Sequence, residues 1–339
     1  MRYYRLEIRD KNGNIPLASD GTPIGPFDTS ETPGRGLHIE FDAPIFGYDV
    51  CGSGTLITIY GLPLSMLRQS VNLSGCLVTL TAGFQNGLPL ANPHQAGIIV
   101  SGEIYNPFAN WIGTNQTLNF SVNPTPLLKE NGTPFSLTID GKQGEKLSDV
   151  LRRAFNLAFP KSRGFNVEIS ISDRLVLPED APGVYSRPET LATVLRSYSK
   201  AIINSDKYLG VQVSFFGRNI RVFDNVGEGF SNETSILPHE LIGQPTWIAY
   251  NAVTFKCPLR YDIRNGDIVT LPSDVISGPA SILSVNTDRS AAWSRERDKV
   301  NFNGNFQIIG VRHVGSFLNA DSSNSWVTIY EAVNQVSVQ

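Results

Sequence analysis

The sequence has very little cysteine, with three residues of this type among 339. They lie far apart and form no Cys-x-x-Cys pair, which excludes a disulfide framework and a zinc knuckle. We therefore expect Cys51, Cys76 and Cys257 to be buried thiols of a protein that is made in a reducing cytosol.

Long hydrophobic runs and a strong excess of one charge are also missing. No run reaches the roughly 18 apolar residues that a membrane-spanning helix needs, and residues 1–7 lack the apolar core of a signal peptide. With 28 basic and 31 acidic residues the net charge is −3, which argues against a nucleic-acid-binding surface. We therefore expect no membrane insertion and no specific binding of nucleic acid.

Motifs for metal binding and catalysis are lacking as well. The four histidines, at positions 38, 94, 239 and 313, do not have the spacing of metal ligands, and His38 lies on the polar side of an alternating segment, where we expect it to be solvated. Residues 51–54 lack the first glycine of a serine-hydrolase elbow. Residues 141–146 lack the full phosphate-loop motif, so we expect a turn there.

Two further patterns permit an enzymatic or a sugar-binding interpretation. Asp42 and Asp49 could form a glycosidase pair, but two carboxylates at this spacing in a β-rich chain are usually loop residues. The tryptophans could form a sugar-binding platform, although packing in the core or between subunits is the expected role of Trp111, Trp247, Trp293 and Trp326. We expect no catalytic residue, no cofactor site and no metal site, and hence no enzyme.

What the sequence does contain favours β-structure in two or three domains. Only 17% of the residues are charged, and 30 glycines with 21 prolines indicate many turns. Short alternating apolar segments, separated by glycines, occur at 6–8, 37–41, 56–60, 77–80, 98–104 and 118–122. Their spacing predicts a closed or nearly closed β-barrel over residues 1–126, which ends at a proline-rich boundary.

Residues 127–225 change to a helical pattern and predict an α+β insertion domain. One apolar stripe predicts a helix that ends at Pro160, and its members are Leu147, Val150, Leu151, Ala154, Phe155 and Ala158. A capping box between Ser186 and Glu189 is predicted to begin a second helix. Its expected apolar face comprises Leu191, Val194, Leu195, Tyr198, Ala201 and Ile202. Strands are predicted at 165–171, 211–215 and 220–222.

Residues 226–339 return to short strands, the clearest of which are 252–257, 266–271, 306–311 and 326–330. Between them, residues 273–304 predict one long loop, and loops of this length are usually functional or disordered.

The first and third regions repeat the same order of segments. The string Gly-x-φ-Val-Thr-Leu, where φ is apolar, occurs at 75–80 and at 266–271, each time after a strand and before a hairpin. We therefore predict duplicated barrels in which Val78, Leu80, Ile268 and Leu271 are buried.

Several segments resemble the baseplate hub proteins of tailed bacteriophages. In the third region they are residues 243–246, 265–271, 304–315 and 326–332, which follow the family's pattern G-x-P, G-D-x-V/I-x-L, G-x-F-x-I-x-x-V-x-H-x-G and W-x-T. His313 matches the hairpin histidine of that pattern, for which we expect a structural role. Residues 75–83 and 97–104 resemble the first barrel of the same family.

This resemblance implies a mainly β chain in which two tail-tube-like barrels, residues 1–126 and 226–339, flank a small two-helix α/β domain. It implies a homotrimeric ring in the tail baseplate of a virion, made in the host cytoplasm and related to the base of type VI secretion spike proteins. The implied partners are tail tube proteins, a separate spike protein and other baseplate proteins. Genomic DNA would pass through the ring without specific binding, so we expect few lysines and arginines in the channel wall.

A carbohydrate-binding or adhesin-like tail module is the alternative, because it would also be β-rich and without catalytic residues. The two functions differ in geometry, since a hub forms a ring whereas a binding module has a groove lined by aromatic residues. The loop at 273–304 is expected at a protein contact or in solvent.

Overall fold

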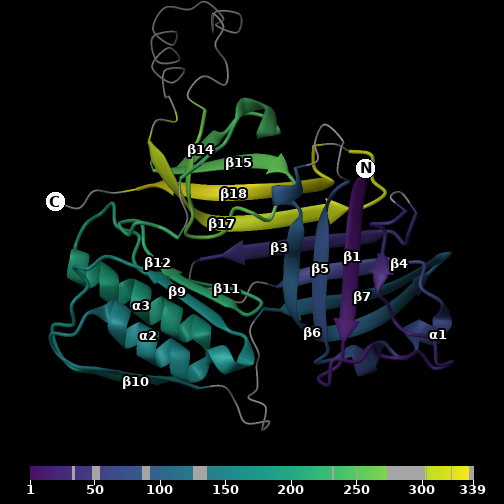
Figure 1. The fold of residues 1–339 in the computed structure, drawn as a ribbon, viewed down its shortest axis with the longest axis horizontal. Helices are drawn as coiled ribbons and strands as arrows, with labels where there is room; N and C mark the ends of the chain where they lie inside the picture. Colours follow the sequence, from purple (N-terminus) through teal and green to yellow (C-terminus); the bar gives the residue numbers. More distant parts are fainter. Residues whose placement is uncertain are drawn as a thin grey trace, which may run out of the picture.

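Two groups of strands, one from each end of the chain, form most of the molecule, and an α+β module lies beside them (Figure 1). The computed structural model describes residues 1–32, 35–47, 54–85, 92–124, 136–230, 233–249, 251–272, 302, 304–321 and 323–335. The predicted mainly β fold is confirmed. The predicted loop at 273–304 lies almost entirely outside the described residues.

The first group, called the first unit, contains six main strands that agree with the apolar segments of the sequence. They are β1 (Arg2–Arg9), β3 (Ile39–Phe46), β4 (Thr55–Tyr60), β5 (Leu77–Phe84), β6 (Gly97–Ile112) and β7 (Asn115–Asn123). The connections carry β2 (Phe27–Asp28), the helix α1 (Leu64–Leu67) and the 3₁₀ turns η1 (Ser70–Leu73) and η2 (Pro93–Gln95). Alternate residues of these strands, such as Leu6 and Ile8, are buried in one core.

The second unit is built from the C-terminal part of the chain. Its strands are β13 (Thr234–Ser235), β14 (Thr246–Ala249), β15 (Ala252–Pro258), β16 (Ile268–Thr270), β17 (Asn305–Ser316) and β18 (Trp326–Asn334), with the 3₁₀ turn η4 (Pro238–Glu240) after β13. Val78 and Leu80 in the first unit, and Ile268 and Leu271 in the second, are at most 7% exposed. The prediction that these four positions are buried is confirmed.

Both units have the same strand order. Across the sheet, the strands of the first unit follow the order β3-β4-β7-β6-β5-β1, and those of the second follow the order β14-β15-β18-β17-β16-β13. When the six strands of each unit are numbered along the chain, both orders read second, third, sixth, fifth, fourth, first. The units differ at one edge, where β1 pairs antiparallel with β5 but β13 pairs parallel with β16.

The register of the two units also agrees. The amide of Gly75 donates to the carbonyl of Ile104 (2.9 Å), and the Ile104 amide donates to Cys76 (2.8 Å). In the second unit, Gly266 donates to Ile308 (2.7 Å) and the Ile308 amide donates to Asp267 (2.9 Å). Both glycines have a positive φ, 78° and 86°, which glycine adopts without steric cost. The two units therefore agree in strand order and in this register.

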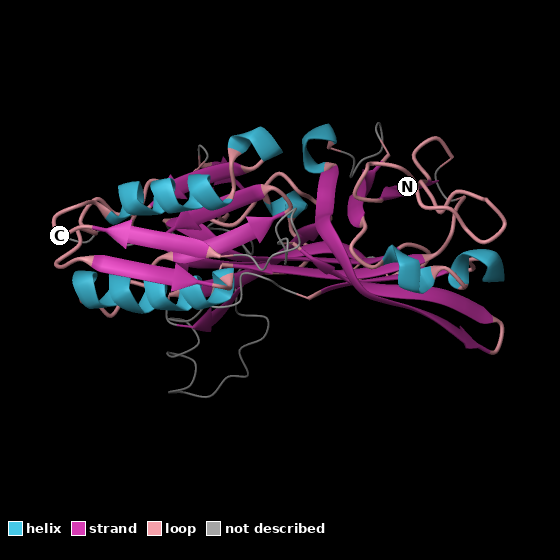
Figure 2. Cartoon of the chain, turned by 90° about the horizontal axis from the view of Figure 1, so that it is seen from below, coloured by secondary structure: helices cyan, strands magenta, loops and turns pink. Residues whose placement is uncertain are grey.

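The predicted closure into barrels is wrong, because the strands form one open sheet of 13 strands. In the first unit, closure would require β3 and β1 to pair. Residues 310–316 of β17 instead pair antiparallel with residues 40–46 of β3, and thereby join the two units. Figure 2 shows the hairpin of β6 and β7 extending away from the C-terminal end of the molecule.

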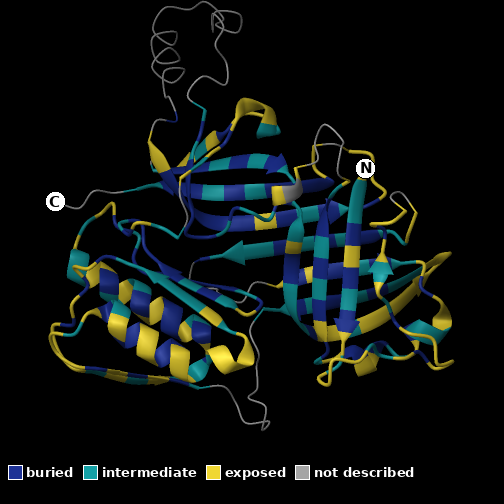
Figure 3. Ribbon diagram, in the orientation of Figure 1, coloured by how far each residue is buried: buried dark blue, intermediate teal, exposed yellow. Residues whose placement is uncertain are grey.

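The middle of the chain folds as the predicted α+β module, with its own core. Its elements are β8 (Leu137–Gly141), α2 (Leu147–Ala158), the 3₁₀ turn η3 (Lys161–Arg163), β9 (Asn166–Ser170), β10 (Ala181–Tyr185), α3 (Pro188–Ile203), β11 (Gln212–Phe216) and β12 (Asn219–Phe223). The strands form a sheet of order β11-β12-β9 and a separate pair of β8 with β10. The stripe predicted for α2 is confirmed, since its first five members are buried and Ala158 packs against the core (Figure 3).

The predicted start and apolar face of α3 need correction. Arg187 is the N-cap and makes no side-chain cap bond, so the predicted capping box of Ser186 and Glu189 is wrong. Pro188 occupies the first turn, where a backbone N–H would have no acceptor within the helix, so the missing N–H of proline costs nothing. Val194 and Ala201 are exposed, whereas Ala192 and Ser199 are buried. Ser199 belongs to the buried face because its hydroxyl accepts the amide of Val211 at 2.8 Å.

Candidate functional site

The junction between the units is formed by β3 and β17. The carboxylate of Asp42 receives two bonds from the guanidinium of Arg312, and the Nε–Oδ1 distance is 2.7 Å. Gly315 lies against the ring of Phe41, which in turn packs edge-on against Trp326 at 5.2 Å. The junction therefore combines an ion pair at the surface with close aromatic packing beneath it.

His313 lies inside this junction and is 3% exposed. Its Nδ1 is 2.9 Å from the hydroxyl oxygen of Thr328, and burial lowers the pKa of the imidazole to about 3. The ring is consequently neutral near pH 7 and packs between strands, which is the structural role expected for it.

A buried arginine connects the two units a second time. Arg260 is 3% exposed, and its guanidinium lies 2.7 Å from Asp262 and 3.2 Å from Glu240. The same Glu240 carboxylate accepts a bond from the side chain of Gln95 in η2 of the first unit at 3.0 Å. Arg260, Asp262 and Glu240 belong to the second unit, so Gln95 is the residue that bonds this buried cluster to the first unit.

Arg221 of β12 attaches the α+β module to the second unit. Its guanidinium lies 2.8 Å from Glu168 of β9 and 2.9 Å from Asp267, and it also donates to the backbone carbonyl of Asn265 at 3.1 Å. Asp267 is almost fully buried, so this ion pair holds the two parts together at a largely buried position.

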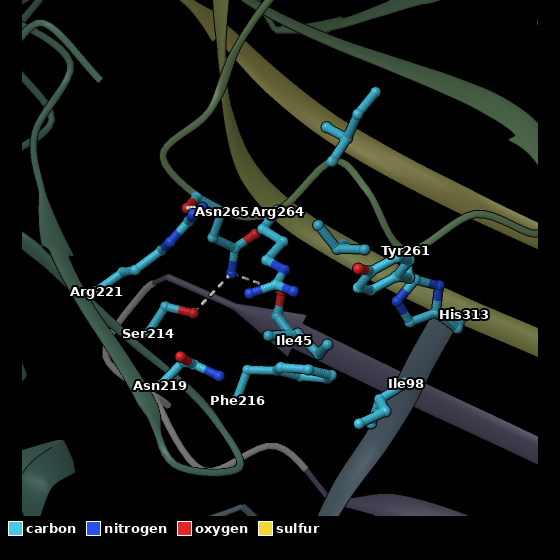
Figure 4. A pocket seen from close by; sticks show the side chains of 12 residues that line it. Ile45, Ile98, Ser214, Phe216, Asn219, Arg221, Tyr261, Arg264, Asn265 and His313 are labelled. Atoms are coloured by element: carbon cyan, nitrogen blue, oxygen red, sulfur yellow. Dashed lines mark hydrogen bonds between the residues drawn. The ribbon is translucent and has the colours of Figure 1, made fainter. Parts of the chain in front are cut away.

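A pocket lies where the module meets the junction (Figure 4). The guanidinium of Arg264 lies over the rings of Phe216 (5.6 Å) and Tyr261 (5.3 Å). The Asn265 amide donates to Ser214 and to the Ile45 carbonyl, both at 3.0 Å. The lining contains no carboxylate, and its one imidazole is that of His313. Among the described residues around the pocket we therefore find no nucleophile–base pair, and its polar groups serve the packing of three parts of the chain.

The remaining histidines do not form a site. His38 is half-buried rather than freely solvated, because its ring lies beside Tyr60 at 4.8 Å and its Nε2 is 3.3 Å from Glu40. His94 and His239 are exposed. Across the described part of the chain, no cluster of histidine, cysteine, aspartate or glutamate could hold a metal ion.

Cys76 and Cys257 are buried free thiols, as expected, whereas Cys51, Ser53 and Asp49 lie outside the described residues. Asp42 is engaged by Arg312 and is not half of a carboxylate pair there. Residues 142–146 form the expected turn before α2, in which the amide of Lys142 donates to the Glu145 carboxylate.

The tryptophans have different environments. Trp326 is buried and donates to the carbonyl of Gly83 at 3.2 Å, and Trp247 stacks on Phe302 at 5.6 Å, so both have the expected packing role. Trp111 is instead 61% exposed on β6, and Trp293 is outside the described residues.

Trp111 is one of four exposed apolar residues of β6 that no pattern in the sequence pointed out. The others are Tyr105, Phe108 and Ile112, whose pairing with β7 places them on the opposite face from Trp111, and all four side chains are 47–69% exposed. β6 continues to Ile112, whereas β5 pairs with it only up to Glu103. The length of this strand-forming segment is the sequence signal that could have indicated the exposed residues. In the described residues, no helix has the length and hydrophobicity to cross a bilayer.

No protein-family model matches the sequence, and no curated protein matches it. Among solved structures, the chain is similar to the E. coli c3393 protein, a component of the type VI secretion system with structural similarity to the T4 tail proteins gp27 and gp5 (TM-score 0.49, 10% identity, 98% of this chain and 77% of that one). It is also similar to the 43 kDa tail protein of prophage MuSo2 from Shewanella oneidensis (TM-score 0.48, 8% identity, 100% of both chains). A third similar structure is a tail protein from Neisseria meningitidis MC58 (TM-score 0.46, 9% identity, 98% and 96%). These three proteins are tail and type VI secretion-system proteins by their descriptions.

Proposed function

We propose that the chain is a structural hub of a phage tail baseplate, in which three copies form a ring around an axial channel. The observation that carries this proposal is the presence of two units of equal strand order and register in one chain, joined through β3 and β17. Three such chains supply six equivalent units, which matches a six-fold tail tube on one face and a three-fold spike on the other.

The way in which the units are joined supports a ring. The junction uses different edges of the two units, β3 from the first and β17 from the second, and is therefore a head-to-tail contact. Repeated head-to-tail contacts either close into a ring or continue as a filament. Each chain already contains one such contact between its two units. Further contacts of the same kind between chains would therefore place successive units around an axis.

The proposed partners are other copies of the chain, tail tube proteins, a separate spike protein and other baseplate proteins of the virion. We assign the two units to residues 1–126 and 226–339 and the module to 127–225. DNA passes through the channel during ejection without specific binding, so the wall carries few basic side chains. The chain performs no catalysis in this role.

The mass of the purified protein tests the proposal. With 37.1 kDa per chain, light scattering or native mass spectrometry should give about three times this value, and electron microscopy should show a ring with a central hole. A protein that stays monomeric at high concentration, or a ring of another order, would contradict the trimer. A channel lined mainly by lysine and arginine would contradict free passage of DNA.

A carbohydrate-binding or adhesin-like tail module is the second candidate, and the exposed aromatic side chains of Tyr105 and Phe108, which share one face of β6, favour it. Glycan-array binding that Tyr105→Ala removes, in a protein whose mass stays that of one chain, would support this function over the hub.

A further inference from the structure

Strand β17 uses the same edge for two partners. Its first residues, 305–307, pair with β16, and residues 310–316 pair with β3, while β18 covers the opposite edge. The equivalent strand of the first unit is β6, whose residues 97–103 pair with β5 and whose opposite edge pairs with β7. Beyond this point, no described strand pairs with the β5-side edge of β6.

The free part of β6 corresponds residue by residue to the part of β17 that pairs with β3. Ile104 is the counterpart of Ile308, because both exchange the same backbone hydrogen bonds with the glycine strand. Each strand has a bulge of one residue shortly after this position. Counting past the bulges, residues 106–112 of β6 correspond to 310–316 of β17, and β6 ends at Ile112.

The two corresponding segments differ in exposure. In β17, His313 and Gly315 are buried, because β3 and the parts packed on it cover them. In β6, their counterparts Ala109 and Trp111 are exposed, Trp111 at 61%. An unpaired edge with exposed aromatic side chains is a site where another strand adds.

The matching free edge belongs to β14. This strand is the counterpart of β3 and ends the sheet, with β15 as its neighbour on the inner side. Its Ile248 is 52% exposed. Val253 of β15 is the counterpart of Thr55 of β4, because the two residues occupy the same position in the pairing of β15 with β18 and of β4 with β7. Trp247 of β14 pairs with Val253, and the register of β3 with β4 places Ala43 opposite Thr55, so Trp247 is the counterpart of Ala43.

We propose that the free edge of β6 pairs antiparallel with β14 of a second copy of this chain, in the register that β17 and β3 use within one chain. Transferring that register pairs Phe108 with Ile248, Ala109 with Trp247 and Asn110 with Thr246. The occupant is a second copy because the complementary edge is present on every chain, and a head-to-tail contact of this kind continues from chain to chain. This inference rests on the proposed ring and specifies its subunit contact.

The chemistry of the contact between chains differs from that of the junction within the chain. At the junction, Arg312 and Asp42 form an ion pair across the strands, whereas the counterparts of these residues are Phe108 and Thr246. The apolar pair of Phe108 with Ile248 replaces the ion pair, so the contact between chains should be insensitive to salt.

A cysteine pair tests the register. In a Cys51→Ser background, Asn110→Cys combined with Thr246→Cys should give disulfide-linked oligomers on a non-reducing gel after mild oxidation. The matched control is Asn110→Cys with Gln244→Cys, which lies two residues out of register and should link at least tenfold less, because disulfides tolerate Cα separations of only about 4.4–6.8 Å.

A charge on the edge tests the contact without oxidation. Phe108→Lys should convert the oligomer to single chains by light scattering, whereas Leu157→Lys, at a 79% exposed position of α2, should leave the mass unchanged. Circular dichroism establishes that both variants are folded. A trimer that shows no in-register linkage and tolerates Phe108→Lys overturns the pairing but leaves the hub. A wild-type protein that never oligomerises overturns the hub and the pairing together, and linked oligomers of another order overturn only the trimer.

Discussion

Gly315 of β17 lies so close to the ring of Phe41 in β3 that a methyl group at position 315 would overlap the ring atoms. Backbone strain does not explain the glycine, because Gly315 is not among the residues with a positive φ. It is explained by the close approach of the two units at their junction.

Gly315→Ala should therefore destabilise the protein by about 1–3 kcal/mol, measured by chemical denaturation, because the ring and the strand must move apart. Gly54→Ala is the matched control, since a methyl group there meets nothing within 4 Å. Adding Phe41→Leu to Gly315→Ala should restore part of the loss. Equal stability of Gly315→Ala and Gly54→Ala would show that the strands are not packed this closely.

Arg221→Gln should lower the free energy of unfolding by about 2–3 kcal/mol, because it removes the ion pair that buried Asp267 makes with β12. Arg152→Gln on α2, which breaks an exposed pair with Asp149, should cost less than about 0.5 kcal/mol. Limited proteolysis gives a second readout, since release of the module from the second unit should speed cleavage in the Arg221 variant only. Similar costs for the two variants would argue against this attachment.

His313 should make the protein less stable in mild acid. The folded state holds the pKa of His313 at about 3, whereas the unfolded chain has the ordinary value of about 6.5. Between these values the unfolded state binds a proton that the folded state does not, so stability falls as the pH falls from about 6.5 towards 3. From pH 7 to pH 5 this amounts to about 2 kcal/mol.

Denaturation curves at pH 7 and pH 5 measure this effect. His313→Gln should be less stable than the wild type at pH 7, because it disturbs buried packing, yet it should lose about 2 kcal/mol less on acidification. If the wild type and His313→Gln lose the same stability between the two pH values, another group causes the acid sensitivity.

Ser199→Ala should destabilise the module by about 1–2 kcal/mol, because the buried amide of Val211 loses its acceptor. Ser197→Ala, at an exposed position of the same helix, should be neutral or slightly stabilising, since alanine favours helix. Thermal unfolding followed by circular dichroism distinguishes the two. A neutral Ser199→Ala would mean that water can replace the hydroxyl.

The strands of both units could be predicted from the sequence, because alternating apolar residues such as Leu6 and Ile8 determine which face of a strand is buried. The β8–β10 pair was missed because β10 reads Ala-Pro-Gly-Val-Tyr, in which proline and glycine indicate a turn. The capping box failed for a similar reason, since the pattern of Ser186 and Glu189 is local whereas Pro188 already sets the start of α3.

Closure of the units and the position of the junction could not be predicted from local patterns. Any free strand edge can accept any other, so the choice between β1 and β17 as the neighbour of β3 depends on the packing of the whole chain. The same holds for His313, whose burial results from contacts of β17 with β3 and β18 that the sequence around it does not reveal.

The junction also has a consequence for biosynthesis. Asp42 and Arg312 are separated by 270 residues, so a ribosome that adds about 5–20 residues per second needs roughly 15–50 seconds to supply β17 after β3 has been made. During this interval the edge of β3 is open to a finished β17 of another chain on the same messenger RNA. Once its own β17 emerges, the tether holds it near β3 at an effective concentration that free chains do not reach. The order of synthesis thus makes the first unit dependent on a strand that is translated about 270 residues later.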